Sequence, residues 1–215
     1  MVKESKYPIL EFDDNKVAKL NPIAFVDELF ETEQLIVTFF PEVMDKLADE
    51  GKITLEKTIG GENPVYIYRF VDDNVLITLG QILVVDGAIR DEGFSYHYVE
   101  PARYIYTEPE TVQKITRYLD NHAISYIRGL TWTTDAVFRE TPDKIEKRKE
   151  EGAKIVEMEQ AGCIAVSQFR GFQYGALIYG GDDVSQDEWS NRAWRSREGI
   201  RYDLVMLCRT LVKII

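Results

Sequence analysis

Two glutamates flank one methionine in the stretch VEMEQAG, residues 156–162. A carboxylate can accept hydrogen bonds from two neighbouring hydroxyls of a sugar at once. The flexible, polarisable side chain of Met158 suits the face of a sugar ring, so Glu159 and Met158 are candidate sugar contacts. The alternative is structural: Glu157 and Glu159 alternate out of a strand edge, and the charge of Glu159 favours the start of a helix.

A strand must give way to a helix at this point of the chain. KIVEM (154–158) is typical of a strand, and EQAGCIAVSQFRG (159–171) is typical of a helix. Ligands of α/β sheets collect where strands end, because strand-end loops and helix N-termini leave polar groups unsatisfied there. The two glutamates therefore fall where a ligand is expected.

The rest of the chain alternates between short apolar runs and amphipathic runs, which predicts one α/β domain over residues 1–215. Glycine, proline and polar residues separate the runs. The remaining predicted strands are 34–40, 53–59, 65–71, 74–80, 81–89, 123–134 and 173–181. The remaining predicted helices are 41–50, 110–120, 141–152 and 186–215, and a tyrosine-rich loop is expected over 90–104.

Composition argues against several classes of partner. The formal net charge of −11 is unlike that of nucleic-acid-binding proteins, which present a concentrated positive face. The longest near-apolar run, residues 75–85, is too short to span a bilayer. The few histidines and cysteines lack metal-ligand spacing, so we expect no metal site. Cys163 and Cys208 lie in apolar helical patterns and no secretion signal is visible, which predicts reduced thiols and a cytoplasmic location.

Four stretches follow one another in a recognisable order. They are VVDGAIRDEGFSYHY (84–98), GLTWTTDAVFRETP (129–142), VEMEQAG (156–162) and GALIYGGDDV (175–184). Together they resemble the nucleoside phosphorylase family, which includes uridine phosphorylases, purine nucleoside phosphorylases and related nucleosidases. The resemblance covers about residues 65–200. It implies a three-layer α/β/α phosphorylase/hydrolase-like fold with a central mixed sheet.

The resemblance also implies roles at the sugar. Glu159 would bind the ribose 2′ and 3′ hydroxyls, Met158 would pack on the sugar, and Glu157 would help to shape the site.

A second acidic stretch follows the strand GALIYGG. Asp182 matches the family's aspartate, which protonates or hydrogen-bonds N7 of a purine, and Arg195 lies at the spacing of its arginine partner. A carboxylic acid at this point can stabilise the departing base. The doublet Asp182–Asp183 has two other interpretations, a solvated acidic turn and a divalent-cation loop. The acids lack the alternating spacing and turn glycine of a calcium loop.

The stretch TWTTDAVFRE would supply contacts to the base. Phe138 can stack on a flat heterocycle, and Thr134 and Val137 can line its edge. A plain core position for Phe138 is the alternative. Uridine-specific members carry a Gln-x-Arg pair shortly afterwards, whereas this chain has FRETPDK, which favours purine or broad specificity. Arg90 and Asp91, in the first of the four stretches, are expected to form a structural ion pair.

The family's phosphate-binding segment has no counterpart in this sequence. In the family, a strand–helix–strand unit with a glycine-rich loop precedes ILVVDGAIRDEG, but here LITLG joins QILVVDG directly at Gly80–Gln81. Such a unit takes on the order of 30 residues. Either this is an internally shortened member that lacks one β-α-β unit, or part of the chain is missing from the sequence. The phosphate ligands are therefore unknown.

The resemblance implies a pentosyltransferase of nucleoside catabolism and purine or uridine salvage. The reaction would cleave a nucleoside with inorganic phosphate as co-substrate, without another cofactor, and give free base and ribose 1-phosphate. The alternatives are a nucleosidase that uses water, and a catalytically inactive nucleoside-binding or oligomer-forming relative. Family members are homo-oligomers, so a dimer or hexamer is expected.

Overall fold

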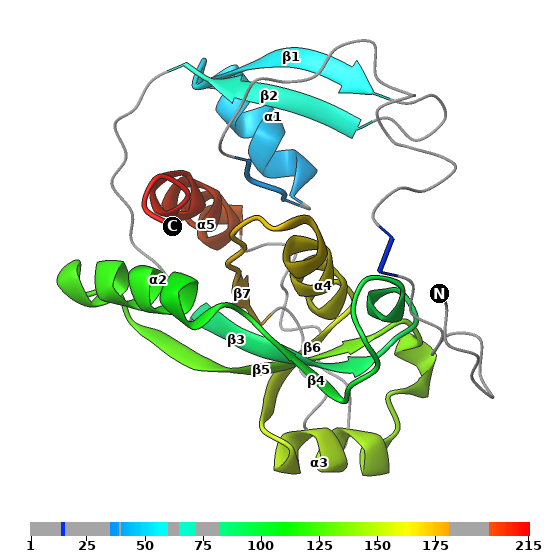
Figure 1. Ribbon diagram of the computed structural model, residues 1–215. Coiled ribbons are helices and arrows are strands. Elements are labelled where there is room, and N and C mark those ends of the chain that lie inside the picture. Colours follow the sequence, from blue (N-terminus) through cyan, green and yellow to red (C-terminus); the bar gives the residue numbers. More distant parts are fainter. Residues whose placement is uncertain (1–13, 16–34, 39, 60–64, 72–81, 181–197) are drawn as a thin grey trace. The chain divides into compact units, whose positions relative to one another are not determined.

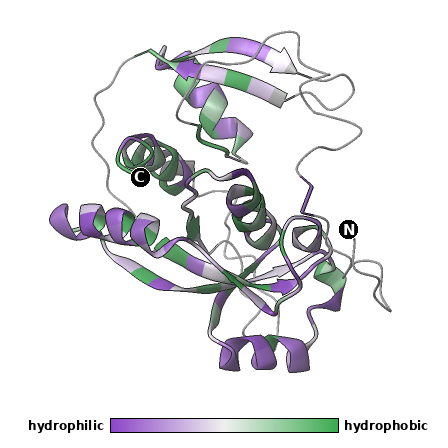
Figure 2. Cartoon of the chain, in the orientation of Figure 1, coloured by the Kyte–Doolittle hydropathy of each residue, from purple (hydrophilic) through white to green (hydrophobic). Residues whose placement is uncertain are grey.

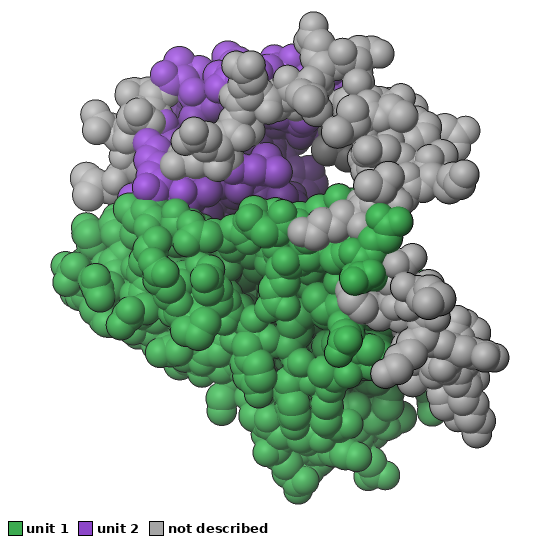
Figure 3. All heavy atoms as spheres, viewed as in Figure 1, with its two compact units in different colours: residues 1–16, 80–194, 214–215 green, residues 17–79, 195–213 purple. Residues whose placement is uncertain are grey.

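The computed structural model describes residues 14–15, 35–38, 40–59, 65–71, 82–180 and 198–215 (Figure 1). The chain forms two compact units, which are coloured separately in Figure 3. The larger comprises residues 1–16, 80–194 and 214–215, and the smaller comprises residues 17–79 and 195–213. Each unit is described by itself, and the single domain over residues 1–215 stays a prediction.

The larger unit is built on a mixed five-stranded sheet. Three of its strands, β3, β5 and β6, are parallel, and the two short strands β4 and β7 both run antiparallel to β3. The sheet order is β4-β3-β5-β6, with β7 also paired to β3. The bounds are β3 Ile82–Asp91, β4 Tyr104–Tyr106, β5 Tyr126–Thr134, β6 Ala153–Glu157 and β7 Leu177–Tyr179. The predicted central mixed sheet is confirmed.

Strand β3 is the centre of this sheet because its sequence is apolar on both faces. Every residue of β3 except Asp86 and Asp91 is buried, as expected for a strand covered from both sides. The ladder with β5 shifts register between Val85 and Gly87. A Cβ atom at Gly87 would lie 2.4 Å from the carbonyl oxygen of Ile105, so only glycine lets β4 approach β3 at this point.

Helices cover both faces of the sheet, as the three-layer prediction requires. They are α2 Pro109–Asn121, α3 Pro142–Glu150 and α4 Gln160–Arg170, with short 3-10 turns η3 Ser95–His97 and η4 Val137–Arg139. Figure 1 shows α4 and α3 on opposite sides of the sheet. Ala161, Ile164 and Ala165 of α4 share a buried cluster with Leu83 and Val85 of β3. Figure 2 shows α3 as an almost wholly hydrophilic helix, so polar contacts must fasten it.

The smaller unit combines a hairpin with two helices. It contains α1 Pro41–Asp49, β1 Ile53–Ile59, β2 Val65–Phe70 and α5 Glu198–Leu211. Strands β1 and β2 pair antiparallel. The predicted bounds of β1 are confirmed, β2 ends one residue earlier than predicted, and the predicted helix does begin at Pro41. The core of the smaller unit contains Val43, Leu47, Ile53, Val205 and Met206.

Three sequence predictions are wrong or incomplete. Residues 35–38 form no strand, and Leu35 and Val37 are exposed, because an apolar run forms a strand only where it finds a pairing partner. Strand β4 lies at the end of the expected tyrosine-rich loop, since three residues are too few to give a periodic signal. The strand predicted over 173–181 is reduced to β7. The predicted strand 74–80 and the Gly80–Gln81 junction lie outside the described residues.

No helix in the described part of the chain has both the length and the apolar character needed to cross a membrane.

Candidate functional site at the carboxyl edge of the sheet

Three parallel strands end at one edge of the larger unit's sheet. Asp91 pairs in register with Thr134, and Thr133 pairs in register with Glu157. The ends of β3, β5 and β6 therefore lie side by side, with α4 beginning directly after β6. Strand ends and a helix N-terminus at one edge are the usual place for a ligand in α/β folds.

Glu157 fastens the switch from β6 to α4. Its Oε2 atom accepts the backbone N–H groups of Glu159 and Gln160, both at 2.6 Å, and its Oε1 accepts the hydroxyl of Thr133 at 2.5 Å. The Thr133 oxygen in turn accepts the N–H of Ala161 at 3.0 Å. Both oxygens of Glu157 are thus bonded within the protein, and they satisfy N–H groups that a helix start leaves free.

Burial raises the pKa of the Glu157 carboxyl, even though the hydrogen bonds from Thr133 and the backbone favour its charged form. The donors are a hydroxyl and two amides, so no cation offsets the loss of water.

Glu159 and Met158 face outward at the same switch. Glu159 is the N-cap residue of α4 and its side chain is exposed. Its Oε2 accepts the N–H of Met158 at 3.2 Å. Met158 is half exposed, at 50%. Glu157, Met158 and Glu159, which the resemblance assigns to the sugar, lie at the turn between β6 and α4. We call residues 157–159 the sugar corner.

The residues predicted for the base separate into a buried and an exposed set. Thr134 is buried, and its Oγ1 accepts the N–H of Ala136 at 3.3 Å, so it shapes the turn after β5. Val137 and Phe138 lie on η4 and are exposed, Phe138 at 96%. The alternative of a core position for Phe138 is therefore wrong. An exposed aromatic ring is available for stacking.

The loop after β3 is ordered around a buried arginine. Arg90 donates from Nε to the hydroxyl of Ser95 and from Nη1 to the carbonyl of Glu100, both at 2.8 Å. Its guanidinium lies over the ring of Tyr96, 4.0 Å from the ring centroid. The predicted ion pair between Arg90 and Asp91 is wrong, because successive residues of a strand point to opposite faces of the sheet.

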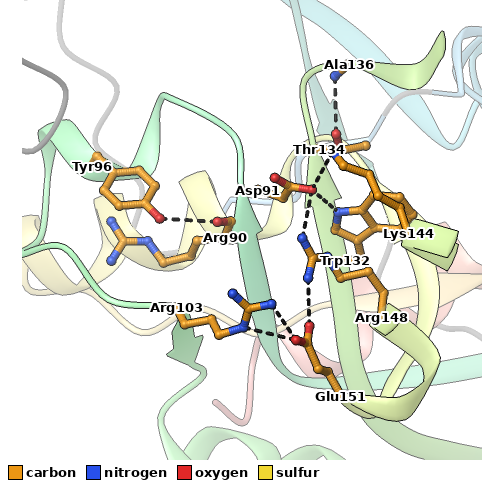
Figure 4. Close-up of polar contacts among 10 residues, drawn as sticks. All are labelled: Arg90, Asp91, Tyr96, Arg103, Trp132, Thr134, Ala136, Lys144, Arg148 and Glu151. Atoms are coloured by element: carbon orange, nitrogen blue, oxygen red, sulfur yellow. Dashed lines mark hydrogen bonds and ion pairs between the residues drawn. The ribbon is translucent and has the colours of Figure 1, made fainter. Parts of the chain in front are cut away.

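Asp91 is instead the centre of a charge network that sequence reasoning missed (Figure 4). Its Oδ2 accepts Trp132 Nε1 at 3.0 Å, Arg148 Nη2 at 3.2 Å and Lys144 Nζ at 3.3 Å. Lys144 and Arg148 are four residues apart on α3 and so share one face of that helix. The sequence shows the spacing of Lys144 and Arg148, but it does not show that Asp91 is their partner.

Glu151 extends this network beyond the end of α3. Its carboxylate accepts Arg148 Nη1 at 2.9 Å and also binds Arg103. Arg148 therefore bridges two carboxylates, and the hydrophilic helix α3 is fastened to the ends of β3 and β5. Arg90 is bonded to the loop after β3, and Arg103 is paired with Glu151.

A hydrogen bond joins the loop after β3 to the loop after β5. The N–H of Gly93 donates to Oδ2 of Asp135 at 3.0 Å. Asp135 belongs to the stretch TWTTDAVFRE, which is predicted to contact the base. The loop with Phe94 and the turn with Phe138 are thus held next to each other.

Asp182 and Arg195, predicted to act on the base, lie outside the described residues. Within the ranges that the structure describes, no group of three histidine, cysteine, aspartate or glutamate side chains is placed to hold a metal ion. Cys163 and Cys208 are free.

Comparison with known proteins identifies relatives of this arrangement. The sequence model of the phosphorylase superfamily matches residues 71–198. An AMP nucleosidase from Bacteroides thetaiotaomicron VPI-5482 is 23% identical, with a TM-score of 0.51, over 63% of this chain and 55% of its own. A purine nucleoside phosphorylase from Toxoplasma gondii, in complex with immucillin-H, is 16% identical with a TM-score of 0.51 over the same shares. This chain thus spans little more than half the length of either protein, and the likeness shows a common fold.

Proposed function

This chain belongs to the phosphorylase superfamily, and from that premise we propose that it binds a nucleoside at the sugar corner and cleaves its N-glycosidic bond. The observation that carries the proposal is the division of labour between the two glutamates. Both carboxylate oxygens of Glu157 accept hydrogen bonds from the protein, whereas the side chain of Glu159 is exposed beside Met158. One glutamate builds the corner, and the other remains open to a ligand.

In the proposed complex, the Glu159 carboxylate accepts hydrogen bonds from the 2′ and 3′ hydroxyls of ribose. The thioether of Met158 packs on the sugar, and Phe138 stacks on the base. Hydrogen bonds from hydroxyls to a carboxylate are stronger than neutral ones. They also fix the orientation of the sugar, so that C1′ faces a constant direction.

The proposed reaction transfers the ribosyl group to inorganic phosphate. The bond between C1′ and the base nitrogen breaks, with its electron pair going to the base, and a phosphate oxygen forms the new bond to C1′. Asp182, assisted by Arg195, supplies a proton or hydrogen bond to N7 of a departing purine. This assistance lowers the barrier because negative charge develops on the base as it leaves.

Hydrolysis is the second candidate, and one feature of the sequence favours it. The segment that carries the family's phosphate loop has no counterpart between Leu79 and Ile82. If no other residues bind phosphate, water takes the place of phosphate at C1′ and the products are free base and ribose.

Base release in the presence and absence of phosphate separates these functions. The purified chain is mixed with inosine, adenosine and uridine, and the free base is followed by chromatography. Release that requires phosphate supports phosphorolysis, and equal release without phosphate supports hydrolysis. If no base appears but a nucleoside raises the melting temperature, the chain is a binding protein and the catalytic proposal is overturned.

A further inference from the structure

Phe94 is an exposed aromatic side chain that the proposed reaction does not use. It precedes η3 in the loop after β3, and 54% of its surface is exposed. Single exposed apolar side chains are common on protein surfaces, so the exposure of Phe94 gains meaning only from the position of its ring.

The ring of Phe94 is seated on Gly162 of α4. A Cβ atom at Gly162 would lie 2.6 Å from Cδ1 of the ring, which is closer than real Cβ contacts, and 3.1 Å from Cε1, so the ring would have to shift. Tyr98 supports the ring from the side, with the two ring centroids 5.0 Å apart, and Phe169 of α4 packs edge-on against Tyr98 at 5.6 Å. One part of the ring is thus fixed by packing, and the rest is exposed.

This seat places Phe94 beside both parts of the proposed nucleoside site. Gly162 lies three residues after Glu159, and residues three apart share one face of a helix. Phe94 is therefore one helical turn from the sugar-binding glutamate. The bond between Gly93 and Asp135 joins its loop to the turn that carries Phe138.

We propose that Phe94 is a substrate-facing wall of the nucleoside site, that it packs on the apolar face of the ribosyl group, and that glycine at position 162 is required to place it there. The proposal rests on the proposed nucleoside binding and adds a contact that determines sugar specificity. An aromatic ring and Met158 would enclose the apolar C–H face of the sugar, while Glu159 binds its hydroxyl edge.

Binding of non-cleavable nucleosides tests the proposal without interference from turnover. The probes are 9-deazainosine and pseudouridine, in which the sugar is attached to a carbon atom of the base, and the dissociation constants are measured by isothermal titration calorimetry on the full chain. Phe94→Ala is expected to weaken both probes by the same factor of roughly ten, because the lost contact is to the sugar that they share. Phe172→Ala, a change at a similarly exposed ring, is the matched control and should leave binding unchanged.

A double-mutant cycle distinguishes loss of the contact between Phe94 and Gly162 from a general loss of structure. Gly162→Ala should weaken binding about as much as Phe94→Ala, because the added methyl displaces the ring. In the double variant, Gly162→Ala should add little, since no ring remains to displace. Gly199→Ala, on α5 with no atom within 4 Å of the added carbon, controls for a glycine replacement in a helix. Circular dichroism and urea unfolding show whether each variant is folded.

Three outcomes decide the matter. Unchanged binding in Phe94→Ala, with binding lost in Glu159→Ala, overturns the role of Phe94 and leaves the proposed function standing. A loss confined to one probe assigns Phe94 to the base and overturns its contact with the sugar. If the unchanged protein binds neither probe, this inference and the proposed function both fail.

Discussion

Glu157 and Asp91 each end a parallel strand of the same sheet, but opposite surroundings hold the two carboxylates. Glu157 is bonded to a hydroxyl and two backbone amides, and burial raises its pKa. Asp91 also loses water by burial, but the hydrogen bonds from two cations and an indole outweigh that loss and lower its pKa. Through its neutral donors, Glu157 holds the backbone at the start of α4. Through its ion pairs with Lys144 and Arg148, Asp91 holds helix α3 against the sheet.

The difference explains which region can serve a ligand. Hydrogen bonds to Glu157 hold the turn between β6 and α4, and the side chains of Met158 and Glu159 that follow face outward. The network at Asp91 uses its charges internally, as Figure 4 shows. We therefore propose that the sugar corner binds the ligand, while the network of Asp91, Lys144, Arg148 and Glu151 attaches α3 to the sheet.

Replacing Glu157 should have the largest effect on stability. Glu157→Ala removes the acceptor for two amides and one hydroxyl, and each partly buried donor left unpaired costs about 1–3 kcal/mol. We expect a loss of about 2–4 kcal/mol in the free energy of unfolding, measured by urea denaturation.

Glu110→Ala is the control for this change, because Glu110 is exposed and pairs with Lys114 on the surface of α2. It should change stability by less than about 0.5 kcal/mol. If Glu157→Ala is as mild as the control, Glu157 does not hold the switch between β6 and α4.

Replacing Asp91 should have a smaller effect that depends on salt. Asp91→Asn keeps an acceptor for Trp132 but removes the charge that faces Lys144 and Arg148. We expect a loss of about 1–2 kcal/mol at low salt, and less at 1 M sodium chloride, because salt screens partly exposed ion pairs.

A cycle with Arg148→Met measures the coupling within this network directly. The two single losses should sum to more than the loss in the double variant. Strict additivity would contradict the ion pair between Asp91 and Arg148.

The stability contributions of the two carboxyl groups should change with pH in opposite directions. These are the smallest of the expected effects. Because the pKa of Asp91 is lowered in the folded state, its contribution is present above the unfolded value near 3.8 and is lost as the pH falls through the folded value. Because the pKa of Glu157 is raised, its contribution is present below the unfolded value near 4.5 and is lost as the pH rises through the folded value.

Urea denaturation from pH 3 to pH 8 measures both contributions against the Asp91→Asn and Glu157→Gln variants. Relative to the unchanged protein, Asp91→Asn should flatten the acid limb, and Glu157→Gln should remove a decline on the alkaline side of pH 4.5. The same slope change in both variants would refute the contrast between the two sites.

Sequence reasoning succeeded where structure is decided locally. The switch at residues 154–162 was predictable because a strand pattern runs directly into a helix pattern. The partners of Asp91 were not, since Lys144 and Arg148 follow it by 53 and 57 residues and meet it only through the sheet. The predicted pairing of Asp91 with the adjacent Arg90 is wrong, because successive residues of a strand point to opposite faces of the sheet. The contact between Phe94 and Gly162 could not be predicted either, because nothing in the sequence connects the loop after β3 to helix α4.

The most direct test of the sugar corner compares one ligand with and without its vicinal hydroxyls. Calorimetry with 9-deazainosine and its 2′,3′-dideoxy analogue should show binding that is roughly 100-fold weaker for the analogue, because two hydrogen bonds to the Glu159 carboxylate are lost. In Glu159→Gln this difference should shrink to about ten-fold or less. Equal affinity of the unchanged protein for the two ligands would contradict the assignment of Glu159 to the ribose.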